Sequence, residues 1–290
     1  MQLDQGSLRV TTSACRLCAH TPVNPVGPAA ALPQVFECPV CNFRQSELPQ
    51  DHADRIRHSP LPDLEAISSA SRRTTRLVLE LLYPFAPDGR LLDVGTGSGT
   101  LIEEAVNRAY VAEGVEPSRA LASSVQQRQL PVRPLALPTE ERFGPYDAIT
   151  AVRVLEEVAH PAAFMTDLVS RLAPGGVCLV VTPDVRSFAA RKLQKKWWHY
   201  HPAAYNFFSE ATLNRLMSDS GLDVVFRRRV PDYLPVEFLF ARLAALLPEK
   251  WRRKLDCPAA LHGYAVGLNT FDLLLYIGRK PGQPHNLPPT

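Results

Sequence analysis

Residues 91–105 read LLDVGTGSGTLIEEA, and the fold class of the chain can be argued from these fifteen positions. An apolar run containing one acid is followed by three alternating glycines and then by an amphipathic segment. This order predicts a buried parallel strand over 90–94, a tight turn over 95–99 and a helix over 101–109. Glycine lets the backbone of such a turn approach a ligand closely, and the helix N-terminus presents unpaired N–H groups to negative charge. The stretch therefore predicts a ligand-binding turn in an α/β domain.

An acidic residue stands at the end of the second predicted strand. The segment VAEGVEPS at 111–118 is an apolar strand that ends at Glu116, twenty-one residues past Gly95. In strand–helix–strand nucleotide-binding units, an acid at about this distance can bind both hydroxyls of a ribose. The dinucleotide fingerprint G-x-G-x-x-G would need glycine at position 100, where this chain has Thr100, and this argues against a pyrophosphate ligand.

An acid two residues ahead of G-x-G-x-G resembles motif I of the class I S-adenosylmethionine-dependent methyltransferases. The resemblance spans about residues 72–230 and includes YDAITAVRVLEEVAHP, LVSRLAPGGVCLVVTP and FFSEATLNRLMSDSGLDVV. It implies a doubly wound α/β fold with a seven-stranded, Rossmann-like sheet, and S-adenosylmethionine as cofactor. By the same resemblance, the residues expected to bind this cofactor are Asp93, Gly95, Thr96, Gly97, Ser98, Gly99, Glu116, Pro117 and, beside the adenine, Leu137.

The stretches VEPS, LEEVAHP and TPDVRSFAARKLQKKWW resemble, more narrowly, a branch of bacterial methyltransferases linked to sugars, polysaccharides or natural products, some with N-terminal four-cysteine ribbons. Relatives usually have histidine at the position of Glu157. Methyl transfer to a hydroxyl is helped by a base that removes its proton. Glu157 is the first candidate, because the loop after the fourth predicted strand opens onto the crevice where ligands bind in such sheets. A solvated carboxylate at a helix end is the alternative. The other candidate bases are His160, His199 and His201, each weighed against a surface or core role.

The densest aromatic stretch, KKWWHYHPAAYNFF, follows the fifth predicted strand, where a lid over the acceptor would lie. Trp197, Trp198 and Tyr205 could form a stacking wall for a sugar or planar acceptor. Aromatic side chains at this density more often pack in a core, and we favour that interpretation.

Two C-x-x-C pairs, Cys15 with Cys18 and Cys38 with Cys41, stand near the N-terminus. A two-residue gap lets both sulfurs of a tight turn bind one tetrahedral ion, and two such turns complete a structural site with no open position. The pattern predicts a zinc ribbon over residues 1–50, with an iron–sulfur cluster or a chance arrangement as alternatives. In a reducing compartment, two such pairs favour metal binding over disulfides.

Composition and charge set wider bounds. The 290 residues are 46% hydrophobic and carry a net charge of +3, which favours a large core and does not demand a polyanionic partner. No apolar run approaches the roughly 18 residues of a membrane-spanning helix or resembles a signal peptide, so we expect a cytoplasmic protein. Beyond the ribbon we expect a linker over 51–71, a methyltransferase domain over 72–280 and a disordered tail over 281–290.

Residues 231–265 are expected to form a helical insertion or lid before the seventh strand. Within them, YLPVEFLFARLAALLPEKWRRKL at 233–255 has an apolar helical stripe and ends in basic residues. A lid or dimer face, a membrane-surface helix and a basic contact to RNA are the three interpretations, and the first is favoured because apolar stripes are usually buried against protein.

These features together predict an enzyme that transfers a methyl group from S-adenosylmethionine to a small or carrier-linked acceptor, with a sugar hydroxyl as one candidate. Two alternatives stay open. One is an RNA methyltransferase that recognises RNA through its ribbon, and the other is a non-catalytic cofactor-binding protein that uses the ribbon for interactions.

Overall fold

The computed structural model describes residues 14–21, 23–26, 34–58, 64–246 and 257–282. Its main feature is a seven-stranded sheet in the order β10-β11-β8-β7-β4-β5-β6. Neighbouring strands from β6 to β8 run parallel, whereas β11 lies antiparallel between β8 and β10. The predicted doubly wound sheet is therefore confirmed. The strands are Gly89–Val94 (β4), Tyr110–Val115 (β5), Val132–Arg133 (β6), Tyr146–Val152 (β7), Leu172–Pro183 (β8), Asp223–Pro235 (β10) and Ala265–Arg279 (β11).

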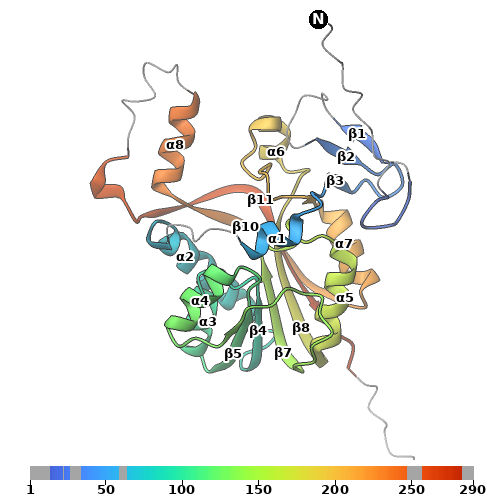
Figure 1. Cartoon of the computed structure of the whole chain (residues 1–290), viewed down its shortest axis with the longest axis vertical. Helices are drawn as coiled ribbons and strands as arrows, with labels where there is room; N and C mark the ends of the chain where they lie inside the picture. The colour runs from blue at the N-terminus through green and yellow to red at the C-terminus, as the bar shows by residue number, and fades with distance from the viewer. Residues whose placement is uncertain (1–13, 22, 27–33, 59–63, 247–256, 283–290) are drawn as a thin grey trace, which may run out of the picture.

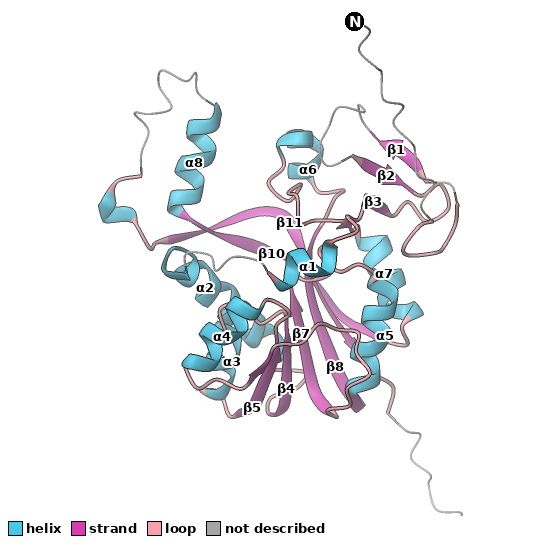
Figure 2. Cartoon of the chain, in the orientation of Figure 1, coloured by secondary structure: helices cyan, strands magenta, loops and turns pink. Residues whose placement is uncertain are grey.

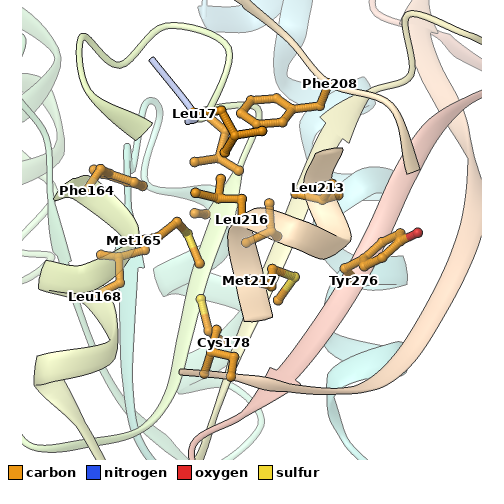
Figure 3. Close-up of a cluster of buried hydrophobic side chains, with 14 of the residues drawn as sticks. Leu17, Phe164, Met165, Leu168, Cys178, Phe208, Leu213, Leu216, Met217 and Tyr276 are labelled. Carbon is orange, nitrogen blue, oxygen red and sulfur yellow. The ribbon is translucent and has the colours of Figure 1, made fainter. Parts of the chain in front are cut away.

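Helices cover both faces of this sheet, because successive residues of a buried strand point to opposite sides. Leu91 belongs to the core shared with α2 and α3, whereas Leu92 belongs to the core shared with α5 and α7. Figure 3 shows this second core, with side chains of α5 facing those of α7. The helices are Leu64–Leu82 (α2), Thr100–Val106 (α3), Arg119–Gln127 (α4), Pro161–Arg171 (α5), Phe188–Leu193 (α6) and Glu210–Asp219 (α7), with short 3-10 turns at Gln194–Lys196 and Ala259–Leu261.

The N-terminal cysteine-containing segment is joined to the rest of the molecule by a strand. A second sheet has the order β1-β2-β3-β9, formed by Asn24–Val26, Val35–Glu37, Arg44–Ser46 and Asn206–Phe207. The last of these comes from the chain between β8 and α7. Leu17 and Phe208 lie in the same core (Figure 3), and the rings of Phe43 and Phe208 are 5.1 Å apart. The small sheet is therefore packed against the large one.

The stretch 51–71, expected to be a linker, contains helical structure. It includes α1, which spans His52–Arg57, and the beginning of α2; residues 59–63 lie outside the described ranges. The His52 side chain is buried. Its Nε2 lies 2.7 Å from the carbonyl oxygen of Glu157, and its ring packs edge-on against that of Tyr205. Apolar periodicity gave no sign of α1, since the helix docks through a histidine and not through an apolar stripe.

The segment 231–265 differs in part from the helical insertion that we expect. β10 continues to Pro235, which pairs with Ala265 at the start of β11, so the two strands form an arm beyond the main sheet. A register shift between Val230 and Asp232 marks the start of this arm. The helix α8, Val236–Leu246, follows the arm and lies away from the sheet (Figures 1 and 2). Residues 247–256, which carry WRRK, lie outside the described ranges.

Among the helices that the structure describes, none combines the length and the apolar content that crossing a membrane requires.

Candidate active site at the carboxyl edge of the sheet

The glycine turn after β4 adopts backbone conformations that side chains disfavour. The φ angles of Gly95, Gly97 and Gly99 are 72°, 54° and 76°. A Cβ added at Gly95 would lie 2.5 Å from Val154 Cγ2, and one at Gly99 would lie 2.8 Å from Val125 Cγ1. At Gly97 the nearest atom would be the Gly95 carbonyl oxygen, at 3.9 Å. Two glycines are thus required by packing, and the third leaves open space beside the turn.

Two buried carboxylates flank this turn. Asp93 accepts a hydrogen bond of 2.8 Å from Thr150 Oγ1, and Glu116 accepts bonds of 2.8 Å from the backbone N–H groups of Gly97 and Ser118. Burial raises the pKa of Asp93 to about 7, opposed by the Thr150 bond and assisted by the charge of Glu116. Burial also raises the pKa of Glu116. Such acids are stabilised by hydroxyl donors or a positive charge from a ligand.

The remaining predicted cofactor residues have mixed surroundings. Thr96 is buried and its hydroxyl donates to the Asp93 carbonyl oxygen at 3.0 Å, so its side chain serves the turn itself. The hydroxyl of Ser98 lies 2.8 Å from that of Thr100. Pro117 is partly buried beside Glu116, and Leu137 packs against the core on the α5 side. The residues from β4 and β5 are brought together directly, whereas Leu137 is seen only in a packing contact.

The loop after β7 carries Glu157, which is partly buried and not fully solvated. Burial raises its pKa to about 7, assisted by the charges of Glu156 and Glu116 and opposed by Arg153. The parallel strands β4, β5 and β7 end at one edge of the sheet, so Glu157 and the two flanking acids lie on the same side of the molecule. A carboxyl group with a pKa near neutrality suits a general base.

The other candidate bases are less suited to proton transfer. His160 is exposed at the start of α5, with no side-chain capping bond. His199 is buried, and its Nδ1 lies 3.1 Å from Arg153 Nη2, so Nδ1 accepts this bond and Nε2 carries the hydrogen. Burial lowers the pKa of His199 to about 4. His201 is partly buried, and burial lowers its pKa as well.

A buried polar network surrounds His199 and was missed in the sequence. The His199 Nε2 atom lies 3.6 Å from carboxylate oxygens of both Asp232 and Asp272, without a hydrogen-bond partner in range. Arg153 Nε donates to Glu156 at 2.8 Å. Asp232 lies on β10 and Asp272 lies on β11, so the pairing of these two strands brings the two acids together. No local motif could have revealed them.

The two tryptophans belong to the same network. Trp197 is buried and donates from Nε1 to Asp272 at 2.9 Å, and Trp198 Nε1 lies 3.4 Å from Asp232. Tyr205 is also buried. The aromatic stretch therefore packs in the interior, as favoured above, and its indole N–H groups have found the partners that buried tryptophans need.

The four N-terminal cysteines form one cluster, with all four sulfurs within 4.8 Å of one another. The Sγ atoms of Cys15 and Cys41 are 3.5 Å apart, and those of Cys18 and Cys38 are 3.6 Å apart. A tetrahedral zinc ion with Zn–S bonds of about 2.3 Å would separate its sulfurs by about 3.8 Å. The donor set and spacing therefore fit zinc.

The two C-x-x-C turns also share one backbone conformation. In each, the residue after the second cysteine has a left-handed φ, 59° at Ala19 and 58° at Asn42. Each of these residues donates its N–H to the carbonyl oxygen of the first cysteine of its turn, at 2.8 and 2.9 Å. Two matching turns that face each other are what a four-sulfur site requires.

Comparisons with known proteins agree with this geometry. Residues 67–226, more than half of the chain, match a family described as a methyltransferase domain. The chain belongs to this family, and its fold is that of the class I S-adenosylmethionine-dependent methyltransferases.

Similar curated proteins carry the name ubiquinone biosynthesis O-methyltransferase. One from Caulobacter sp. is 32% identical over 114 residues, covering 37% of this chain and 45% of the relative. Another, from Psychrobacter cryohalolentis, is 30% identical over 106 residues, covering 32% of this chain and 40% of the relative. The chain thus spans less than half of the length of the curated relatives that it matches.

Similar solved structures cover more of the chain at lower identity. A methyltransferase from Thermotoga maritima, a possible histamine N-methyltransferase, has a TM-score of 0.52 and 21% identity, covering 75% of this chain and 94% of that one. The N-methyltransferase NodS from Bradyrhizobium japonicum, in complex with S-adenosylhomocysteine, has a TM-score of 0.51 and 14% identity, covering 79% and 96%. At these identities the structures establish the fold.

Proposed function

We propose that this protein transfers a methyl group from S-adenosylmethionine to an oxygen atom of a small or carrier-linked acceptor. The supporting observation is the grouping of the glycine turn, the buried acids Asp93 and Glu116, and Glu157 at one edge of the sheet. The family and the structural neighbour that holds S-adenosylhomocysteine support the cofactor.

In this proposal the two buried acids divide the cofactor between them. Glu116 would accept bonds from the ribose hydroxyls, and Asp93 and the turn would face the methionine part. Neither carboxylate forms an ion pair within 4.0 Å among the described residues, so both can accept ligand donors. The open space beside Gly97 leaves the backbone accessible to a ligand.

The bound cofactor supplies a sulfonium, from which the methyl group leaves in an in-line displacement. The protein must therefore orient the acceptor and remove its proton. Glu157 is the proposed base, because its carboxyl group is near half-ionised at neutral pH. The curated relatives are named as O-methyltransferases, which supports oxygen as the methylated atom. A sugar hydroxyl remains our proposal for the acceptor class.

The ribbon would hold one structural zinc ion on the four cysteine sulfurs. None of these four cysteines forms a disulfide, which suits the reducing cytoplasm, where we propose that the protein acts. The arm that carries α8 would serve as a lid or a dimer face, with peripheral membrane contact as a further proposal for 233–255.

Binding and turnover can be tested separately. Calorimetry should show binding of S-adenosylhomocysteine and no competition by NAD. Methyl-labelled S-adenosylmethionine, incubated with a panel of sugar-hydroxyl, phenol and amine acceptors, should then label an oxygen atom, as read from the product by NMR. Tight NAD binding would refute the cofactor, and label on nitrogen alone would refute the acceptor class.

A further inference from the structure

The loop that carries Glu157 is held through its backbone carbonyl groups. Leu155 and Val158 direct their carbonyl oxygens at the same side-chain amide, because Asn206 Nδ2 donates to both, at 2.9 and 2.7 Å. Asn206 is 1% exposed, so water does not compete for these bonds. One side chain thus fastens both ends of the loop.

The two carbonyl groups between these ends are held as well. The carbonyl oxygen of Glu156 accepts from the backbone N–H groups of Tyr205 and Asn206, at 2.7 and 3.0 Å. That of Glu157 lies 2.7 Å from His52 Nε2. All four consecutive carbonyl groups are therefore bound by residues of α1 and of the segment that forms β9.

The ribbon in turn holds β9. Asn206 pairs with Gln45 of β3. Arg16 lies inside the first C-x-x-C turn, and its Nη1 donates to the Asn206 side-chain oxygen at 2.9 Å and to the Tyr205 carbonyl oxygen at 2.8 Å, while its Nη2 donates to the Ser46 carbonyl oxygen. A single guanidinium thus joins the metal-binding turn, β3 and β9.

We propose that Arg16 and Asn206 are positioning residues through which the metal-bound ribbon holds the Glu157 loop in place. The path from the turn of Cys15 and Cys18 to the loop needs two hydrogen-bonded steps, one from Arg16 to Asn206 and one from Asn206 to the loop carbonyls. A ribbon of this size depends on its ion for folding, so loss of the ion releases Arg16. The effect on catalysis rests on the proposed function, whereas the hydrogen-bonded link between the ribbon and the loop does not.

Hydrogen exchange on the full chain tests the link without any acceptor. Removing the metal with a chelator should raise exchange in peptides covering 153–158 by at least about tenfold, the factor that corresponds to losing roughly one hydrogen bond. Peptides covering 91–99 should be unchanged, and calorimetry should show S-adenosylhomocysteine binding within about twofold of the untreated protein. If a metal-free protein keeps its original exchange at 153–158, the inference is wrong.

Two variants and a matched control separate the link from general destabilisation. Arg16→Met should raise exchange at 153–158 with the metal still bound, and Arg16→Lys, which keeps the charge without the planar fork, should fall between. Asn206→Asp keeps the oxygen that Arg16 binds and loses the donor to Leu155 and Val158. Arg44→Met is the control, because Arg44 belongs to the same ribbon and pairs with Glu37 instead of the loop.

Once an acceptor is known, kinetics add a further reading. A released loop exposes Glu157 to water, so the acid limb of the pH–rate profile should move below pH 7 in Arg16→Met and stay in place in Arg44→Met. An identical profile in both variants would contradict the positioning role. If Glu157 is not the base, Glu157→Gln will leave the rate unchanged. The hydrogen-exchange results do not depend on that outcome.

Discussion

Three acidic side chains near one sheet edge have no ion pair within 4.0 Å among the residues that the structure describes. Asp93 and Glu157 have pKa values raised to about 7, and Glu116 is raised by burial as well. By contrast, Arg153 donates hydrogen bonds to Glu156 and His199. The acids beside the turn are therefore left to interact with a ligand, while the cation is held by the neighbouring network.

Glu157→Gln should lower the rate of the chemical step by about two to four powers of ten, the range that general-base catalysis contributes. The affinity for S-adenosylhomocysteine should be unchanged. In the parent protein, activity should rise with pH through about 7 as the Glu157 carboxyl group ionises, because burial and then the charge of Glu156 raise its pKa to about 7. Single-turnover rates measure both effects. Glu80→Gln is the matched control, since Glu80 is exposed on α2. A rate that survives Glu157→Gln and is lost in His201→Gln would place the base on the aromatic stretch.

Gly97→Val should abolish binding of S-adenosylhomocysteine, because the side chain would occupy the open space beside the turn and strain a backbone with φ of 54°. Gly221→Val is the matched control: Gly221 has φ of 85°, and a Cβ there meets nothing within 4 Å. It should cost stability and spare binding, as measured by calorimetry. Equal loss of binding in both variants would mean that strain alone explains the result.

Local signals in the sequence identified some elements and missed others, for a physical reason in each case. The glycine turn is readable because its residues are consecutive and its backbone demands glycine at Gly95 and Gly99. The contacts of His52 and of β9 with the Glu157 loop could not be predicted from the sequence. They join segments more than forty residues apart, and they use backbone atoms that every residue possesses. The arm of β10 and β11 was missed because its pairing continues past the end of the apolar strand pattern.

The protein purified without added metal should contain one zinc ion per chain by elemental analysis. Cys38→Ser should lose this ion and raise hydrogen exchange across residues 10–46, with cofactor binding nearly intact, because the glycine turn belongs to the other sheet. Cys257→Ser, which alters a cysteine outside the cluster, should keep the ion. Iron accompanied by visible charge-transfer absorption would replace the zinc assignment.

For the molecule as a unit, the buried acids make stability depend on pH. Burial raises the folded-state pKa of Glu157 from 4.5 to about 7, so between these values the folded state holds a proton that the unfolded state has released. The free energy of unfolding should therefore fall as pH rises from about 4.5 to about 7 and level off above it.

Glu157→Gln removes this contribution. Denaturant unfolding should find the variant more stable than the parent by about 1–3 kcal/mol at pH 8, with a difference near zero at pH 4. Subtracting the parent curve cancels the contributions of titrating groups that do not interact with Glu157. A constant difference between the two pH values would show that Glu157 is solvated.

The strands of the small sheet β1-β2-β3-β9 are synthesised at widely separated times. The four cysteines and β3 leave the ribosome early, whereas β9, the fourth strand of their sheet, follows about 160 residues later, a delay on the order of ten seconds at typical elongation rates. During that interval the edge of β3 is unpaired and the thiols depend on the metal alone for order. If the proposed zinc ion binds at this stage, it would protect the thiols from oxidation while the methyltransferase sheet is still being made.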